Sequence, residues 1–488
     1  ALLALAAILL AAGLRFVALE ADFPAGLDWS ADLYTDEGWY SGNASAWAIT
    51  GQWYIPGDFN SAINLPVFPL FQAASFRLLG VSLASARLTE ALFSLALLGL
   101  AYALARRLAG PLTAILAALL LSTSFTLFAF SRLALLEIPL TVFVLASLLL
   151  ALSTRRRPLA LGFSAACFAA AVLTKTTALP LLPALLYAAW CGASDANGQT
   201  RDKLASVLAV LAGATGLLLA YNVLAYIRFP VDYVYFNTAN VTPRGEWTPF
   251  FVLQAAARIL YNGLVLDKLM YPLALGLLPI FLLAFRSFRR DRLVILAIVW
   301  FAGYAGYLAI RGYLPPRYYL PLAVPVALVF SRMVGFGSEW LRRGRRQVAW
   351  LPLAAAAGIA ALNLAAIFGY LSAPRYTFRD LGRDLARRAA QSPIPGGGRP
   401  TLLGNLANTL SISSGLPSIN TELGPKGLAW KVQRYQPEYF VSLGEEKDVL
   451  NRLGAFYQVQ ELAIYDVFDN YIRGKQVHLY RLLAPAGG

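Results

Sequence analysis

Long apolar runs recur from one end of the chain to the other, separated by short polar connections. A helix that crosses the hydrocarbon core of a bilayer needs about 20 such residues. Backbone polar groups in lipid must also be hydrogen-bonded within their own segment. The pattern therefore predicts a polytopic α-helical membrane protein. Roughly eleven spans are expected, near residues 1–19, 82–105, 110–129, 138–154, 159–174, 176–192, 204–226, 270–285, 293–310, 318–335 and 349–371.

Composition supports the membrane assignment. Hydrophobic residues make up 58% of the chain and charged residues only 14%, which is outside the usual range of soluble domains. No secretory cleavage pattern is evident near the start, so the first apolar run is expected to remain as an anchor.

The net charge of +15 is distributed between the apolar runs rather than gathered on one face. Basic clusters occupy every second connection, a pattern that indicates loops on the cytoplasmic side. A nucleic-acid partner is not expected, because phosphate binding would require the charge on one face. The clusters are Arg106-Arg107, Arg155-Arg156-Arg157, Arg201 with Lys203, Arg286 with Arg289, Arg290 and Arg292, and Arg342-Arg343 with Arg345-Arg346.

The alternation places two long connections, 20–81 and 227–269, on the outer side of the membrane. Their mixed aromatic and polar pattern predicts short helices lying in the interface. After about residue 373 the chain has charges of both signs and short apolar runs, which indicate a small α/β domain on the same outer side. The expected organisation is a membrane domain, 1–372, followed by an extracytoplasmic soluble domain, 373–488.

Motifs for metal or nucleotide chemistry are absent from the sequence. Cys167 and Cys191 fall in or at the end of apolar spans, so a structural disulfide is not expected. The single histidine, His478, lies in an alternating run that favours a partly buried strand residue. The sequence contains no CxxC, HExxH or P-loop pattern, and we expect neither a metal nor another cofactor.

The outer connections nevertheless contain the parts of a group-transfer site. Asp36 and Glu37 supply carboxylates, and the basic candidates are Arg132, Lys175, Arg311 and Arg317. Glycosyl transfer from a lipid phosphate requires a base for the acceptor hydroxyl. It also requires cations to stabilise the departing phosphate. Carboxylates together with Arg and Lys outside the bilayer fit this chemistry.

Three short motifs give the chain a resemblance to a known family. They are the Asp-Glu pair in LYTDEGWY, the segment SRLALLE, and RYYLPLAVP near the predicted tenth span. With this topology, they resemble the protein O-mannosyltransferase and aminoarabinose-transferase superfamily of the GT-C fold. The similarity covers about the first 370 residues in topology.

The resemblance implies roles for individual residues. Asp36 would be the general base with Glu37 beside it, and Arg317 would contact the donor phosphate. Arg132 and Lys175 would share that contact. The expected supporting residues are Glu137, Asn64, Tyr318 and Tyr319.

One position departs from the family pattern. Many relatives carry a His or Lys before proline in the first loop, where this chain has Asn64-Leu65-Pro66. Neutral Asn64 cannot supply that cation or metal ligand. The remaining basic residues, Arg132, Lys175 and Arg317, would therefore have to make the contact with the donor phosphate. No D-x-D tripeptide stands in the outer loops, so a metal is not expected.

Structural roles compete with each assignment. Asp36 and Glu37 also suit the first turn of a helix, and Arg132 with Glu137 could form an ion pair that closes a hairpin. Lys175 could be an interfacial anchor. The segment Arg317-Tyr318-Tyr319 could belong to an aromatic belt with a headgroup-binding arginine.

The sequence as a whole favours an inverting glycosyltransferase of the plasma (inner) membrane. Its donor would be a polyprenyl-phosphate-linked sugar, and its acceptor a hydroxyl of a protein, glycolipid or polysaccharide on the extracytoplasmic face. The alternative is a multi-span transporter of a lipid-linked or small polar solute, which should show mid-span charges and an internal repeat. A non-catalytic lipid-binding scaffold ranks third because it leaves the Asp36 loop without a role.

Overall fold

The computed structural model describes residues 2–30, 32–155, 157–239, 250–311, 314–391, 398–468 and 476–484. Two features discussed above fall partly outside these ranges. Arg156 of the second basic cluster is one, and residues 240–249 of the second long connection are the other.

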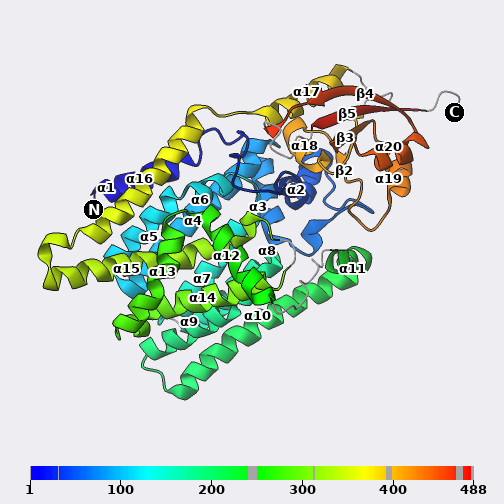
Figure 1. Ribbon diagram of the computed structural model, residues 1–488. Coiled ribbons are helices and arrows are strands. Elements are labelled where there is room, and N and C mark those ends of the chain that lie inside the picture. The colour runs from blue at the N-terminus through cyan, green and yellow to red at the C-terminus, as the bar shows by residue number, and fades with distance from the viewer. Residues whose placement is uncertain are drawn as a thin grey trace.

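Helices form most of the described chain (Figure 1). The α-helices are α1 (Leu2–Leu14), α2 (Asp32–Thr50), α3 (Val67–Leu79), α4 (Leu83–Ala109), α5 (Pro111–Thr123), α6 (Phe125–Phe130), α7 (Glu137–Ala151), α8 (Arg157–Thr174), α9 (Leu182–Asp195), α10 (Thr200–Arg228), α11 (Pro230–Ala239), α12 (Phe251–Leu266), α13 (Met270–Ala284), α14 (Arg292–Ala309), α15 (Ala323–Gly344), α16 (Leu351–Ser372), α17 (Thr377–Gln391), α18 (Ala407–Ser414), α19 (Leu428–Tyr435) and α20 (Lys447–Gly454).

Short 3-10 turns and five strands complete the description. The turns are η1 (Ser61–Ile63), η2 (Thr176–Leu181), η3 (Phe288–Arg290), η4 (Pro316–Leu322) and η5 (Arg346–Val348). The strands are β1 (Leu402–Leu403), β2 (Ser418–Ile419), β3 (Tyr439–Leu443), β4 (Gln458–Tyr465) and β5 (Val477–Leu483).

The polytopic membrane fold predicted from the sequence is confirmed. Seven helical stretches in the described ranges are long and apolar enough to cross a membrane, and five shorter apolar helices accompany them. Each of the eleven predicted spans contains one of these helices. The remaining apolar helix, α3, lies within the first long connection, where short interfacial helices were expected.

Two predicted spans end earlier than expected, for local reasons. The first helix stops at Leu14 because Arg15 turns its guanidinium back to carbonyls at the end of α5, with Nη1 2.8 Å from the Ser122 oxygen. The predicted span 110–129 divides at Ser124. The side chain of Ser124 accepts a hydrogen bond from the Leu127 amide and so starts the separate helix α6.

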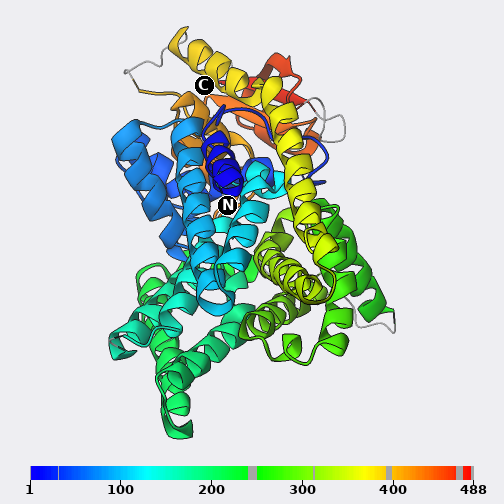
Figure 2. The same ribbon diagram turned by 90° about the vertical axis from the view of Figure 1, so that its left-hand side faces the viewer.

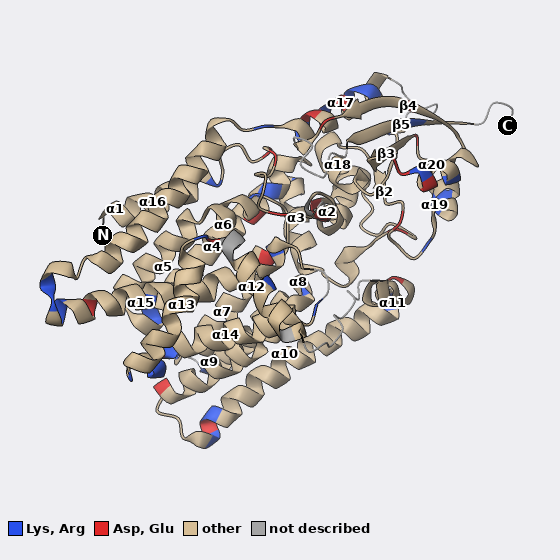
Figure 3. Ribbon diagram, in the orientation of Figure 1, with Lys and Arg blue, Asp and Glu red and all other residues tan. Residues whose placement is uncertain are grey.

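Basic residues are frequent in the connections at one end of the helical bundle (Figure 3). Lys and Arg colour the turns at the end of the bundle farthest from the C-terminal sheet, among them the α9–α10 and α15–α16 connections. This is the segregation expected from the alternation of basic loops. The orientation of the protein in its membrane stays a prediction.

The C-terminal part contains the predicted small α/β unit. Its strand order is β2-β1-β3-β5-β4, with β1 parallel to β2 and β3, and β5 antiparallel to β3 and β4. Apolar side chains of β3 and β5 are buried between the sheet and its helices. His478 is a residue of β5, as predicted, but it is buried rather than partly buried, and its Nδ1 lies 2.7 Å from Glu461 Oε1.

This unit sits at one end of the bundle and packs on the first long connection (Figures 1 and 2). The Thr409 hydroxyl of α18 donates to the Tyr34 carbonyl of α2 at 2.5 Å and accepts from the Gly38 amide at 3.0 Å. The rings of Tyr34 and Phe468 stack at 3.5 Å. Helix α2 is therefore held by the C-terminal unit on one face, which leaves its other face to the membrane domain.

Candidate active site

Helix α2 carries the predicted base, Asp36, to the centre of a charged cluster. Asp36 Oδ2 accepts a hydrogen bond from Arg317 Nη2 at 2.9 Å, and Nη1 of the same guanidinium lies 3.3 Å from Asp28 Oδ2. Arg317 is only 1% exposed. One buried guanidinium thus joins two carboxylates from the first connection to the turn η4 at the start of α15.

The Asp36–Arg317 pair borders a cavity of about 360 Å³, within the size range of small-ligand sites. Five parts of the chain contribute its walls: α2, the loop after it, η2, α11, and the segment from α14 to η4. The lining residues are Asp32, Asp36, Trp39, Tyr40, Phe59, Leu65, Lys175, Thr176, Thr177, Phe236, Ala239, Tyr307, Arg311, Arg317 and Tyr318.

We refer to this cavity as the catalytic cavity because it contains the predicted base, Asp36. Lys175 enters it from the start of η2. Its ammonium lies 2.5 Å from Glu137 Oε1 and 4.3 Å from the centre of the Tyr318 ring. The Arg317 guanidinium lies 5.3 Å from the same ring. Both cations therefore lie over the Tyr318 ring, an arrangement that stabilises positive charge.

Burial controls the electrostatics of the two carboxylates. Desolvation raises the pKa of Asp36 to about 6, although the charges of Arg317 and Lys175 act in the opposite direction. Desolvation also raises the pKa of Asp28, against the effect of Arg317. A carboxyl with a pKa near 6 can both hold and release a proton close to neutral pH.

Glu37 faces away from the cavity, although it is the next residue in the sequence. Its two carboxylate oxygens accept from Arg87 Nε at 2.9 Å and Nη2 at 2.7 Å, and Oε1 also accepts from the Ala134 amide at 2.9 Å. Successive residues of a helix point in different directions. The neighbouring carboxylates therefore meet different partners, and Glu37 joins α2 to α4 and to the loop before α7.

Arg132 is placed differently from its predicted role. It lies outside the lining of the catalytic cavity, donates to the Ala18 carbonyl, and stacks over the Phe128 ring at 5.0 Å and the Tyr370 ring at 5.3 Å. Glu137, for which an ion pair with Arg132 was one expectation, pairs with Lys175 instead. The loop 131–136 turns Arg132 toward the chain after α1, so its contact with a donor phosphate stays a prediction.

The predicted supporting residues lie in different places relative to the cavity. Tyr318 lines the catalytic cavity, whereas Tyr319 is fully buried and Asn64 lies outside the lining. Asn64 is the C-cap of the turn η1, and both polar atoms of its side-chain amide are buried without a hydrogen-bond partner among the described residues. The next residue, Leu65, lines the cavity.

Two charged residues were missed by sequence reasoning: Asp28, which contacts Arg317, and Arg87, which pairs with Glu37 away from the cavity. Arg87 lies inside an apolar span, and a charged residue there was a usable signal of function or pairing. Asp28 lies in the same connection as Asp36, but nothing local distinguishes it from an ordinary loop aspartate. In the described ranges, no group of three or more His, Cys, Asp and Glu side chains is arranged to hold a metal ion.

Comparison with known proteins supports the resemblance seen in the motifs. The family model for dolichyl-phosphate-mannose-protein mannosyltransferases matches residues 63–226. The structure of ArnT from Cupriavidus metallidurans bound to undecaprenyl phosphate superposes with a TM-score of 0.62. The match is 17% identical and covers 100% of this chain and 98% of that one. The chain has the fold of the GT-C glycosyltransferases.

A second GT-C structure agrees over a smaller share of its length. The archaeal oligosaccharyltransferase AglB from Archaeoglobus fulgidus, in complex with an inhibitory peptide and a dolichol-phosphate, gives a TM-score of 0.50 at 12% identity. The match covers 90% of this chain and 69% of that one. No curated protein sequence gives a significant match. The predicted similarity to the mannosyltransferase and aminoarabinose-transferase superfamily is confirmed at the level of the GT-C fold.

Proposed function

We propose that this protein transfers a sugar from a polyprenyl-phosphate-linked donor to an acceptor hydroxyl, with inversion, at the extracytoplasmic surface of the membrane. The observation that carries the proposal is the buried contact between Asp36 and Arg317 at the wall of a cavity that also contains Lys175 and Arg311. A base and several cations are the groups that this reaction requires. The GT-C fold and the lipid phosphate bound to ArnT support the same chemistry.

Asp36 acts as the base. Its Oδ2 is occupied by Arg317, and among the described residues no hydrogen bond reaches Oδ1, which is the atom left for the acceptor hydroxyl. The hydroxyl oxygen attacks the anomeric carbon while its proton passes to Asp36. The bond from the anomeric carbon to the phosphate oxygen breaks at the same time, and polyprenyl phosphate departs.

The cations stabilise the charge that develops on the leaving phosphate. Arg317, Lys175 and Arg311 all line the catalytic cavity, and two of them already lie against Tyr318. Fixed cations in a site shielded from water stabilise such a charge without reorganisation during the reaction. Glu137 positions Lys175, and Arg317 has the further task of orienting Asp36.

The decisive experiment uses purified protein in a neutral-lipid nanodisc with a polyprenyl-phosphate donor labelled in its sugar. We expect the label to leave the donor, either to an acceptor or slowly to water, and to leave at most about a hundredth as fast with Asp36→Asn. Donor binding by native mass spectrometry should persist in that variant. Lys447→Gln, a charge change on the exposed C-terminal surface, is the matched control. Unchanged release of sugar by Asp36→Asn would contradict the proposal.

A further inference from the structure

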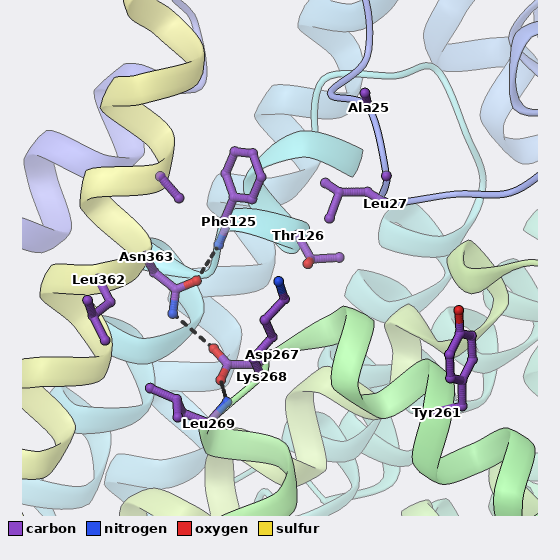
Figure 4. Close-up of a pocket in the computed structure, with 12 residues that line it drawn as sticks. Ala25, Leu27, Phe125, Thr126, Tyr261, Asp267, Lys268, Leu269, Leu362 and Asn363 are labelled. Carbon is purple, nitrogen blue, oxygen red and sulfur yellow. Dashed lines mark hydrogen bonds between the residues drawn. The ribbon is translucent and has the colours of Figure 1, made fainter. Parts of the chain in front are cut away.

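Glu90 on α4 is a buried carboxyl group without a hydrogen-bond partner. The residue is 0% exposed, and neither of its side-chain oxygens has a partner among the described residues. Every other buried carboxyl group in these ranges accepts at least one hydrogen bond. Asp267, in the wall of another cavity, accepts from Asn363 Nδ2 at 2.9 Å and from the Leu269 amide at 2.9 Å (Figure 4). The remainder are Asp22, Asp28, Asp36, Glu37, Asp58, Glu137 and Asp232. Glu90 is the exception among them, and an ionisable side chain at membrane depth is usually functional.

The surroundings of Glu90 require it to hold its proton. Among the described residues, the charges that act on it are those of Glu137 and Glu37, and both are negative. An ionised carboxylate with neither a hydrogen bond nor a counter-ion is strongly unstable in the interior of a protein. Glu90 is therefore a neutral carboxylic acid, whose O–H group is available to donate a hydrogen bond.

Helix α4 places Glu90 near both of these acidic residues. It lies three residues after Arg87, and residues with this spacing share one face of a helix. Arg87 binds Glu37, whose Oε1 also accepts from the Ala134 amide, three residues before Glu137. Glu137 is the first residue of α7, which packs along α4. The face of α4 that carries Glu90 is thus directed toward the start of α7.

Of the two acidic neighbours, Glu137 is the one whose cation takes part in the proposed reaction. Glu37 is held by Arg87 away from the catalytic cavity, whereas Lys175, the partner of Glu137, lines that cavity. A donor phosphate in the cavity would attract Lys175 and draw it from Glu137. The Glu137 carboxylate would then be buried without its cation, which is strongly unfavourable. Another hydrogen-bond donor at Glu137 would lower that cost.

From these observations, we propose that Glu90 donates a hydrogen bond to Glu137 when the donor phosphate draws Lys175 away, and so makes Lys175 available to the phosphate. The inference rests on the proposed function and adds a positioning residue to its donor site. The proton stays on Glu90: the N–H contact of Lys175 with Glu137 is broken and an O–H contact from Glu90 replaces it. Hydrogen bonds to an ionised acceptor are the strong ones. The contact requires a change of side-chain rotamer, because Glu90 has no partner in this structure.

Glu90→Leu separates this role from a structural one. Leucine removes a buried polar group that has no partner, so the unfolding temperature should be unchanged or higher. Binding of undecaprenyl phosphate, measured by native mass spectrometry of the gently solubilised protein, should nevertheless be about tenfold weaker, the order of one hydrogen bond to a charged group. Glu90→Gln keeps a donor in its amide and should retain most of the binding. The control is Ser94→Ala, a buried position one turn further along α4, which should leave binding unchanged.

A double-mutant cycle tests Glu137 as the acceptor. In Glu137→Gln no carboxylate holds Lys175, so adding Glu90→Leu should change undecaprenyl phosphate binding by no more than about twofold. A tenfold effect in both backgrounds would overturn the inference. So would full binding by Glu90→Leu, or a marked loss of its stability, which would show that the carboxyl group serves the fold. In each of these cases the unmodified protein binds the lipid and the transferase proposal stands. Absence of binding by the unmodified protein would contradict that proposal and this inference together.

Discussion

Asp58 and Lys431 form an ion pair in which both side chains are fully buried, with Lys431 Nζ 2.9 Å from Asp58 Oδ1. Asp58 belongs to the first long connection and Lys431 to α19 of the C-terminal unit. The pair is completed by the Asn420 amide, which donates to Asp58, and by the Asn420 and Leu423 carbonyls, which accept from Lys431. Phe59, the residue after Asp58, lines the catalytic cavity. The C-terminal unit is thereby fixed to the wall of the site.

Lys431→Met should be strongly destabilising. It leaves the Asp58 carboxylate buried without its cation, and breaking a buried pair in this way costs about 3–5 kcal/mol. Thermal unfolding followed by intrinsic fluorescence measures the loss. Asp58→Asn combined with Lys431→Met removes both charges and should recover part of the stability. A double variant no more stable than Lys431→Met alone would argue against the pair as the cause.

Gly38 sets the distance between α2 and α18. A Cβ at this position would meet the Thr409 backbone and hydroxyl, so Gly38→Ala requires the two helices to separate. Because Gly38 is two residues after Asp36, we expect lower kcat with little change in donor binding, since a small displacement of a base strongly lowers the rate. The control is Gly358→Ala on α16, where a Cβ meets no atom within 4 Å. Equal kcat for Gly38→Ala and the control would show that the contact does not position the base.

Adjacent carboxylates should behave in opposite ways when substituted. Asp36→Asn should abolish turnover with only a small loss of stability, because Asp28 still pairs with the buried Arg317. Glu37→Gln should lower the unfolding temperature more and leave residual turnover in the folded fraction. The reason is that Glu37 neutralises the buried Arg87 and faces away from the catalytic cavity. Turnover per folded molecule, normalised by size-exclusion chromatography, separates the effects. Complete loss of turnover in well-folded Glu37→Gln would restore the catalytic role first suggested by its position beside Asp36.

The sequence was sufficient to predict the elements, because the membrane restricts backbone conformation to a few solutions. Apolar run length located a helix at each of the eleven predicted spans, and short apolar runs indicated the α/β unit that contains β3 and β5. The sequence could not show in which direction each charged side chain points. Glu37 and Arg132 were grouped with Asp36 because they are close in sequence or motif, yet helix geometry and the loop 131–136 turn them to other partners.

Ion pairs between residues far apart in the sequence could not be predicted either. Arg317 and Asp28 are separated by most of the membrane domain, and Lys431 joins Asp58 from another unit. No local pattern in the sequence identifies such partners. The charged residues themselves were recognisable, since ionisable groups at membrane boundaries are costly unless paired or functional. Their grouping into one site depended on the folded structure.

The pH dependence of turnover should report Asp36. Burial raises the pKa of this carboxyl to about 6 in the free enzyme. The base must be ionised to accept a proton, so kcat/KM for the donor should be constant well above pH 6, half-maximal near pH 6, and fall about tenfold per unit below it. Because burial raises the pKa, any change that admits water should move the midpoint lower. Thr177→Gly removes a side chain from the cavity wall without changing the charge, so we expect it to lower the pH midpoint of kcat/KM. A midpoint near pH 4 in the unmodified protein would mean that Asp36 is solvated in the working enzyme and that its burial does not persist there.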